Sequence, residues 1–191
     1  MGQVKASTPS GYRATHKNEP PQQDLKIRYA WGVRNLYIND QVRNQVRYSG
    51  SGSTCLFITA ALGVEMNLKN REQSFYQGQS DDLISFAISP DKKICATGQM
   101  AELNKANPKA KIVDVHVWDA ETKQLKVKLT GFHQRAVVLV VFSPSGKRLL
   151  TVGQDDKNSL AVYDWEASTK PIWSSTVDGA KVTGAAWKSE T

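Results

Sequence analysis

A stretch of the chain returns after 54 residues, and this repeat limits the possible folds more than any other feature of the sequence. SDDLISFAISPDKKICATGQ at 80–99 is matched by VVLVVFSPSGKRLLTVGQDDKN at 137–158, with a Ser-Pro turn, a lysine and a Gly-Gln in the same order. Pro90 and Pro144 are 144 − 90 = 54 positions apart, and Gly98 and Gly153 are 153 − 98 = 55 apart, which we attribute to one extra residue in the second turn. Such self-similarity is typical of folds that repeat one supersecondary unit.

Short apolar runs separated by turn residues follow one another from residue 25 onward, and this pattern favours an all-β fold. One unit of four expected strands lies at 83–89, 93–98, 111–119 and 124–129, and the next lies at 136–143, 148–153, 159–165 and 171–176. Runs at 54–59, 63–68 and 73–78 fit strands two to four of an earlier unit, and 182–190 begins a further one. Four short strands per unit predict a partial β-propeller of about two and a half blades.

The repeat also assigns roles to turns and loops. The two Ser-Pro segments are expected to be tight turns into the second strand, with Asp91 or Gly146 in the unusual backbone conformation. The polar, lysine-bearing insertion at 99–111 is expected to be a surface loop. Cys55 and Cys95 lie in apolar runs about one blade apart, so we expect buried, reduced thiols on the second strands of neighbouring blades.

Composition changes divide the chain into three parts. Residues 1–24 are polar and contain three prolines, so we expect a tail that is extended or disordered until a partner orders it. Residues 25–53 precede the blades, which occupy 54–191 and are incomplete at the C-terminal end. The formal charge of +7 is concentrated in 25–78, where seven basic residues face three acidic ones. A basic face attracts an acidic partner, although solubility alone explains a charge of this size equally well.

The sequence contains no motif that indicates enzyme chemistry. It has no glycine-rich phosphate loop, no cluster at metal-ligand spacing and no nucleophile–base arrangement, so we expect no enzyme activity, no metal and no cofactor. Nucleic-acid binding would rest on the pI of 9.4 alone, without a stacking platform between the basic groups. The longest apolar run, at 136–142, is too short to span a bilayer, and Ala6 stands where an N-myristoylation pattern requires Ser or Thr. We therefore expect neither nucleic acid nor membrane as a partner.

Several of these motifs resemble one known family. VWD at 117–119 and VYD at 162–164 are similar to WD repeats, and GQSDDLISFAISPDKKICATGQ at 78–99 resembles a blade of the echinoderm microtubule-associated protein-like family. LKIRYAWGVR at 25–34 and VRNQVRYS at 42–49 resemble the hydrophobic motif that opens the propeller region of that family. Trp31 and Val33 depart from the tyrosines that the family prefers, and residues 35–41 interrupt the motif. The resemblance covers about 25–190.

The resemblance implies a non-enzymatic protein that binds the tubulin lattice in the cytoplasm, on the cytoskeleton or in a ciliary axoneme. Because tubulin is acidic, the candidate contacts are the basic residues Lys26, Arg28, Arg34, Arg43 and Arg47. Another interpretation is that these side chains pack along the protein's own surface. The structural motif residues are expected to be Trp31, Gly32, Asn44, Tyr48, Trp118, Asp119, His133, Asp155, Asp164 and Trp165. His133 would brace its blade, and the aspartates would hold turns through side-chain hydrogen bonds.

A second hypothesis is a general WD-repeat scaffold that recruits other axonemal or scaffold proteins without touching tubulin. Closure of a propeller ring takes at least four blades, and raw strand edges otherwise stay open. We therefore expect either that the 191 residues are part of a longer polypeptide or that another chain completes the ring, and the interrupted unit at 182–190 favours the first.

Overall fold

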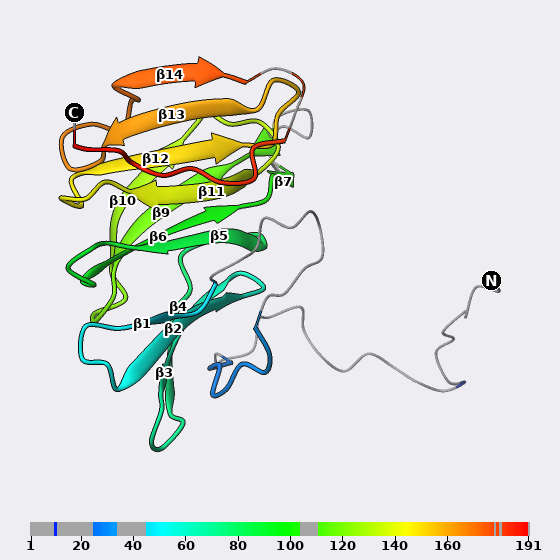
Figure 1. The fold of residues 1–191 in the computed structure, drawn as a ribbon. Helices are drawn as coiled ribbons and strands as arrows, with labels where there is room; N and C mark the ends of the chain where they lie inside the picture. Colours follow the sequence, from blue (N-terminus) through cyan, green and yellow to red (C-terminus); the bar gives the residue numbers. More distant parts are fainter. Residues whose placement is uncertain are drawn as a thin grey trace.

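The described part of the chain folds into antiparallel β-sheets, and we analyse it in a computed structural model that describes residues 10, 25–33, 45–103, 111–177, 179 and 181–190. Three four-stranded sheets follow one another in the order of the sequence (Figure 1). The first sheet contains β1 (Arg47–Tyr48), β2 (Thr54–Thr59), β3 (Leu62–Asn67) and β4 (Gln73–Tyr76), in this order.

The second and third sheets are the two units that the repeat predicts. The second has the order β10-β9-β6-β5, with β5 (Leu83–Ile88), β6 (Ile94–Gln99), β9 (Asp114–Asp119) and β10 (Leu125–Thr130). The third has the order β11-β12-β13-β14, with β11 (Val137–Phe142), β12 (Arg148–Gly153), β13 (Ser159–Asp164) and β14 (Trp173–Thr176). The all-β fold of four-stranded blades is therefore confirmed.

Both ends of the blade series differ from the expected strand assignment. Residues 47–48 belong to the stretch assigned to the opening motif, yet as β1 they pair with Cys55 and Leu56 and complete the first sheet. At the other end, 182–190 contains no strand, and this segment runs as an extended chain beside the third sheet (Figure 1). The described residues therefore form three four-stranded sheets, and the segment 182–190 that follows them contains no strand.

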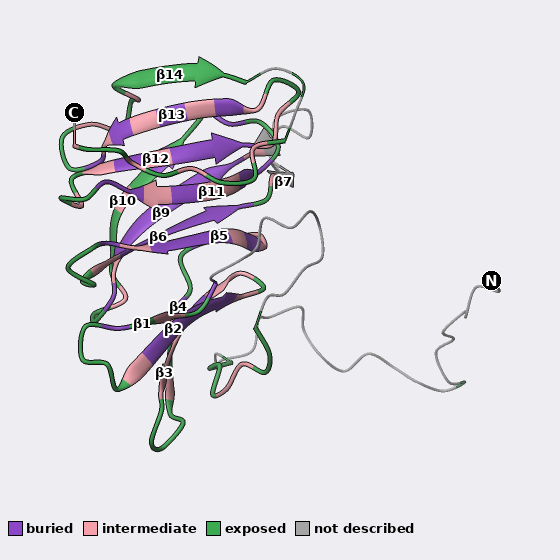
Figure 2. Ribbon diagram, viewed as in Figure 1, coloured by how far each residue is buried: buried purple, intermediate pink, exposed green. Residues whose placement is uncertain are grey.

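The sheets pack face to face through their apolar side chains. Figure 2 shows that the middle strands β6 and β9 are almost entirely buried. Between the first and second sheets the core contains Leu56, Tyr76, Leu83 and Trp118, all buried. Between the second and third sheets it contains the buried side chains Val115, Val117, Val137, Leu149 and Tyr163. The inner strands β5 and β11 lie side by side, and the Ser85 hydroxyl donates to the Val137 carbonyl at 2.6 Å. Removing these apolar faces from water is the main force that holds one blade against the next.

The two Ser-Pro turns have the same length, and this corrects the explanation given for the 55-residue interval. Each turn is closed by a bond over five residues, from Ser89 N to Ile94 O and from Ser143 N to Arg148 O. The register pairs Ser85 with Gly98 but Leu139 with Val152, so the structural repeat stays at 54 and the two Gly-Gln pairs are offset by one position.

The unusual backbone conformation in the first of these turns is also not where we expected it. Lys92, rather than Asp91, has the positive φ of 61°, and its repeat equivalent Gly146 has a φ of 78°. In the second turn, glycine therefore occupies the left-handed position as expected, since a side chain disfavours that conformation. In the first turn, a lysine tolerates it.

The insertion is less loop-like than its composition suggests. Gln99 is fully buried at the end of β6, and β7 (Glu102–Leu103) pairs with β8 (Lys111–Ile112) in a two-residue ladder. The remainder of the insertion, 104–110, lies outside the described residues. Cys55 on β2 and Cys95 on β6 are both buried and free, as predicted.

Candidate interaction surface

The five basic residues expected to contact tubulin do not lie on one element. Lys26 and Arg28 are exposed on the segment 25–33, which has no regular secondary structure. Arg47 is half-buried on β1, and Arg34 and Arg43 lie outside the described residues, as does Asn44 of the opening motif. The three candidates that the structure describes therefore lie in two separate places, the segment 25–33 and a groove beside β1.

The segment 25–33 is attached to the first sheet near its middle. The Ala30 N–H donates to Gln73 Oε1 at 2.8 Å, and Gln73 Nε2 donates back to the Ala30 carbonyl at 3.2 Å. Tyr29 points its hydroxyl toward the Met66 sulfur at 3.8 Å. Its ring lies 4.7 Å from the ring of Trp31, tilted by 47°, and Trp31 is 86% exposed. Gly32 follows with a φ of 86°, a value that glycine adopts without strain.

These contacts leave both charge and apolar surface open on the same segment. Lys26 and Arg28 carry the charge, and Leu25 and Trp31 are the most exposed of its large apolar side chains. An exposed tryptophan among cations is unusual on a free surface and is common where a protein meets a partner. The segment is therefore suited to contact with an acidic surface that also offers apolar groups.

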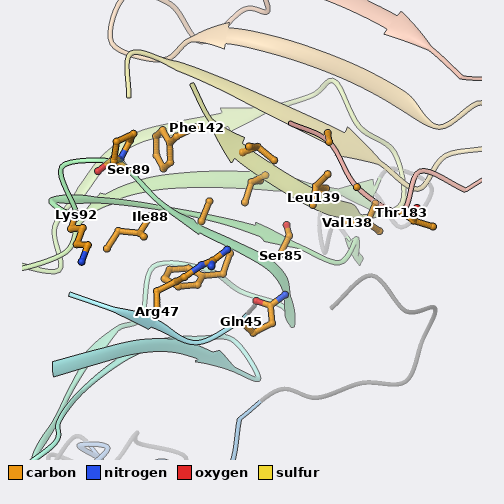
Figure 3. A pocket seen from close by; sticks show the side chains of 17 residues that line it. Gln45, Arg47, Ser85, Ile88, Ser89, Lys92, Val138, Leu139, Phe142 and Thr183 are labelled. Carbon is orange, nitrogen blue, oxygen red and sulfur yellow. The ribbon is translucent and has the colours of Figure 1, made fainter. Parts of the chain in front are cut away.

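A groove of about 540 Å³ lies between β1, the inner strands β5 and β11, and residues 183–185 (Figure 3). Among the described residues that line it, Arg47 and Lys92 are the charged ones, and none is a carboxylate. Gln45 is only 8% exposed, donates to the Ile84 carbonyl at 3.3 Å, and has no partner for its Oε1 among the described residues. Because two cations face an otherwise largely apolar wall, the groove favours negatively charged groups.

A buried hydrogen-bonded chain crosses the third blade. His133 Nδ1 lies 2.7 Å from Ser159 Oγ, and its Nε2 lies 2.8 Å from Thr151 Oγ1. Ser159 donates in turn to the carboxylate of Asp155. Burial lowers the pKa of His133 to about 4, although the nearby Asp155 opposes this shift. His133 and Asp155 thus join the start of the blade to β12 and β13, which is the geometry that a bracing role requires.

The second blade contains a related chain that the sequence reading missed. The Thr97 hydroxyl donates to Gln79 Oε1, and Trp118 Nε1 donates to Thr97 Oγ1 at 3.1 Å. The repeat could have revealed it, because 133 − 79 = 54 and 151 − 97 = 54 place Gln79 and Thr97 on His133 and Thr151. The equivalence of Gln79 and His133 was not recognised because the two residue types differ, although both side chains offer a hydrogen-bond donor and an acceptor.

The remaining motif residues lie at strand ends and on the blade surface. The Asp119 carboxylate accepts the backbone N–H of Glu121 at 3.0 Å and of Thr122 at 2.9 Å, and these bonds, with the nearby Lys126, lower its pKa. At Asp164 the turn is closed by the backbone carbonyl, which accepts from Ala167 N and Ser168 N. A side-chain role for Asp164 stays a prediction.

Two aromatic motif residues of the blades and one of the opening motif differ widely in exposure. Trp165 is buried and donates from Nε1 to the Gly146 carbonyl at 2.8 Å. Trp118 is fully buried, and its ring stacks in parallel on Tyr76 at 4.6 Å. Tyr48 is 63% exposed, so this part of the opening motif presents an aromatic ring to solvent.

The contact between the first two blades also contains polar links that no motif indicated. Lys123 Nζ lies 2.5 Å from Glu65 Oε2 across the two sheets. Burial raises the pKa of Glu65, but its hydrogen bonds from Lys123, Thr54 and Ser74 and the Lys123 charge outweigh this and lower it overall. Tyr76 OH lies 2.6 Å from His116 Nδ1, and burial lowers the pKa of His116 to about 4. The two residues of each pair are far apart in the sequence, so the contact can be identified only from the structure, in which the blades pack together.

The described residues were also inspected for metal-binding groups and membrane spans. Among them, no group of three or more His, Cys, Asp or Glu side chains is placed to hold a metal ion. The described chain also has no helix that is both long and apolar enough to cross a bilayer.

Comparison with known proteins places the chain among relatives of one kind, although no family model matches it. The chain is 33% identical over 162 residues to human "Echinoderm microtubule-associated protein-like 1", covering 83% of this chain and 19% of the relative. It is 30% identical over 164 residues to human "Echinoderm microtubule-associated protein-like 2", covering 84% of the chain and 24% of the relative. It is also 30% identical over 162 residues to the "77 kDa echinoderm microtubule-associated protein" of Strongylocentrotus purpuratus, covering 83% of the chain and 22% of the relative.

The chain thus spans about a fifth of the length of the curated relatives it matches. More than four fifths of its own residues take part in each of these three matches. These matches, at 30–33% identity, identify the chain as a member of the echinoderm microtubule-associated protein-like family.

Proposed function

We propose that this protein is a non-enzymatic microtubule-associated protein that binds the tubulin lattice through the segment 25–33 and its propeller blades. The observation that carries the proposal is the match of more than four fifths of the chain to proteins whose names describe microtubule association. On this proposal the protein lies on cytoplasmic microtubules or on those of a ciliary axoneme. It needs no cofactor for this role.

The charge distribution supports an acidic partner such as tubulin. The chain carries a net charge of +7, and Lys26 and Arg28 extend into solvent on a segment that Ala30 and Gln73 fix to the first sheet. Because the segment is attached at its middle, its cations reach a partner without a large loss of chain entropy. Trp31 beside them adds apolar contact area, which charge alone does not supply.

The test is co-sedimentation of the purified chain with taxol-stabilised microtubules over a range of salt concentrations. We expect the chain in the pellet at low salt, moving to the supernatant as salt rises and after depolymerisation. Lys26→Glu with Arg28→Glu reverses the charge of the segment and should weaken binding by roughly tenfold or more.

A matched control reverses two exposed lysines of the third blade, Lys157 and Lys170, to Glu. This control makes the same change in net charge, so equal losses in both variants would mean that only the overall charge matters. If the chain does not bind microtubules, and if its complexes in cell extracts persist after depolymerisation, the protein acts as a scaffold for other proteins instead.

A further inference from the structure

The turn between β11 and β12 binds a carboxylate that comes from a different part of the chain. Ser143 Oγ donates to Glu190 Oε1 at 2.9 Å, and Ser145 Oγ donates to the same oxygen at 2.6 Å. The Ser145 backbone N–H donates to Glu190 Oε2 at 2.9 Å. Arg148 Nη1 also donates to the Glu190 backbone carbonyl at 2.7 Å. Both carboxylate oxygens are therefore engaged by a turn 45 residues earlier in the sequence.

The equivalent turn of the second blade supplies its own carboxylate. Asp91 stands at the position of Ser145, since 145 − 91 = 54. Ser89 Oγ donates to Asp91 Oδ1 at 2.5 Å, and Lys93 N donates to the same oxygen at 3.1 Å.

The serine that precedes the proline has the same role in both turns. It accepts a backbone N–H five residues later, at 2.9 Å from Ile94 N to Ser89 Oγ and at 3.1 Å from Arg148 N to Ser143 Oγ. The two turns thus share one design, and in the third blade the internal acid is replaced by serine.

A second contact holds the same segment beside the inner strand of the blade. Trp187 Nε1 donates to the Val141 carbonyl on β11 at 3.2 Å. Among the described strands, β11 pairs with β12 on one side and with none on the other, so its carbonyls on the open edge need partners. Thr183 of the segment also lines the groove that β5 and β11 share (Figure 3).

We propose that the β11–β12 turn is a carboxylate-binding slot that latches residues 181–190 onto the third blade and fixes the register in which this segment follows β11. The slot fits the acidic side chain of an extended segment, and Glu190 is its occupant. This inference does not depend on tubulin binding. It explains why the segment keeps a defined place although it forms no strand of its own.

The latch should respond to pH in one direction. The hydrogen bonds from Ser145 and Ser143, with the charge of Arg148, lower the pKa of Glu190 although desolvation opposes them. The latch is therefore fully formed above the ordinary pKa of a glutamate and is lost as the pH falls through the lowered value.

The test measures backbone hydrogen exchange of the whole chain by mass spectrometry. Ser145→Asp gives the turn an internal acid like Asp91 and places a negative charge beside Glu190. We expect the amides of 181–190 to exchange about tenfold faster or more in this variant, while the amides of β11 and β12 keep their rates. Glu190→Gln should also accelerate exchange of 181–190, and it should add nothing further in the Ser145→Asp background.

Glu166→Gln is the matched control, since Glu166 is exposed on the same blade. It should leave every rate unchanged. Unchanged exchange of 181–190 in both Ser145→Asp and Glu190→Gln would overturn the latch. So would equal acceleration of 181–190, β11 and β12, because that result would mean general destabilisation of the blade. Failure of microtubule binding would leave this outcome untouched.

Discussion

Single residues at the repeated positions decide how each blade is held together. The buried hydroxyls of Thr97 and Thr151 connect the start of a blade to its middle strands, through Gln79 and Trp118 in one blade and through His133 in the other. Tyr163 takes the place of Trp118 in the third blade, and burial raises its pKa to about 12, with a bond to Thr151 acting in the opposite direction. The same scaffold thus accepts different partners around a threonine that stays the same.

Replacing Thr97 by Val should show what this hydroxyl contributes. The substitution keeps the side-chain shape but leaves Trp118 Nε1 and Gln79 Oε1 buried without their partner. We expect the free energy of unfolding in urea to fall by about 2 kcal/mol. Thr130→Val on the exposed face of β10 is the control, with an expected change within about 0.5 kcal/mol. Equal effects of the two substitutions would refute the network.

The positive φ at equivalent turn positions leads to two substitutions with opposite results. Gly146→Ala should lower the free energy of unfolding by about 1 kcal/mol. The added Cβ would lie at an ordinary contact distance of 3.5 Å from Pro90 Cδ, so the cost comes from the left-handed backbone conformation alone. Lys92→Gly should raise it by up to about 1 kcal/mol, since a side chain leaves the left-handed region. A loss of stability for Lys92→Gly would mean that the lysine side chain contributes more than the strain costs.

At the scale of elements, the blades are joined by polar contacts as well as by their apolar faces. The ion pair of Glu65 on β3 with Lys123 in the β9–β10 turn links the first two sheets, and the bond from Ser85 to Val137 links the second and third. Glu65 also accepts a hydrogen bond from Thr54 Oγ1 at 2.8 Å, so its carboxylate is fixed within its own sheet. These polar contacts hold neighbouring blades together in addition to their apolar faces.

Lys123→Met removes the cation while keeping most of the apolar stem. We expect the free energy of unfolding at neutral pH to fall by about 1–2 kcal/mol, between the values for exposed and buried pairs. The wild-type advantage should be complete above the ordinary pKa of a glutamate and should disappear as the pH falls through the lowered pKa of Glu65. Lys126→Met tests the specificity, because Lys126 on β10 pairs with Asp119 at the end of β9 at the longer distance of 3.6 Å, with its own side chain 42% exposed, and should change stability little.

The strands were predictable from the sequence where the repeat supplied two independent copies. The expected strand at 148–153 is β12 residue for residue, because a turn residue bounds each end of that apolar run. The strand β1 was missed, since two residues, Arg47 and Tyr48, carry no alternation of their own and pair only because β2 offers an edge. The carboxylate of Glu190 was missed for a related reason, since its partners lie in another unit.

For the whole molecule, two buried histidines make stability depend on pH. His116 and His133 have pKa values lowered to about 4 by burial, so both are neutral in the folded chain at pH 7. The unfolded chain binds protons at the ordinary histidine pKa near 6.5. Stability is therefore complete above this value and is lost progressively as the pH falls toward about 4.

We expect the free energy of unfolding to decrease by up to about 3 kcal/mol for each histidine between pH 7 and pH 4. Urea unfolding followed at several pH values measures this slope. His133→Gln keeps a hydrogen-bonding side chain, as Gln79 does in the second blade, and should flatten the slope by about half. An unchanged slope in this variant would show that other groups cause the acid sensitivity.

The whole-molecule assignment depended on the order of motifs along the chain. The spacing of the blades and the opening segment indicated the family from the sequence. In contrast, the sequence did not predict that Lys26 and Arg28 lie in a different place from Arg47, although the three residues are close in the chain. Basic residues in one stretch say nothing about which side of a sheet they reach, because β1 turns Arg47 toward the groove while 25–33 lies on β3 and β4.

Trp31 and Trp118 differ in exposure to solvent, so their fluorescence can report on different parts of the protein. Trp118 is enclosed and stacked on Tyr76, so a dissolved quencher such as iodide cannot reach its indole ring until the first two blades separate. Trp31 stands open beside Lys26 and Arg28, and its emission should respond at once to anything that covers the segment 25–33. The chain has five tryptophans, and Trp173 is also 52% exposed, so comparison of the wild type with a Trp31→Phe variant isolates the fluorescence change that a partner on the segment 25–33 causes.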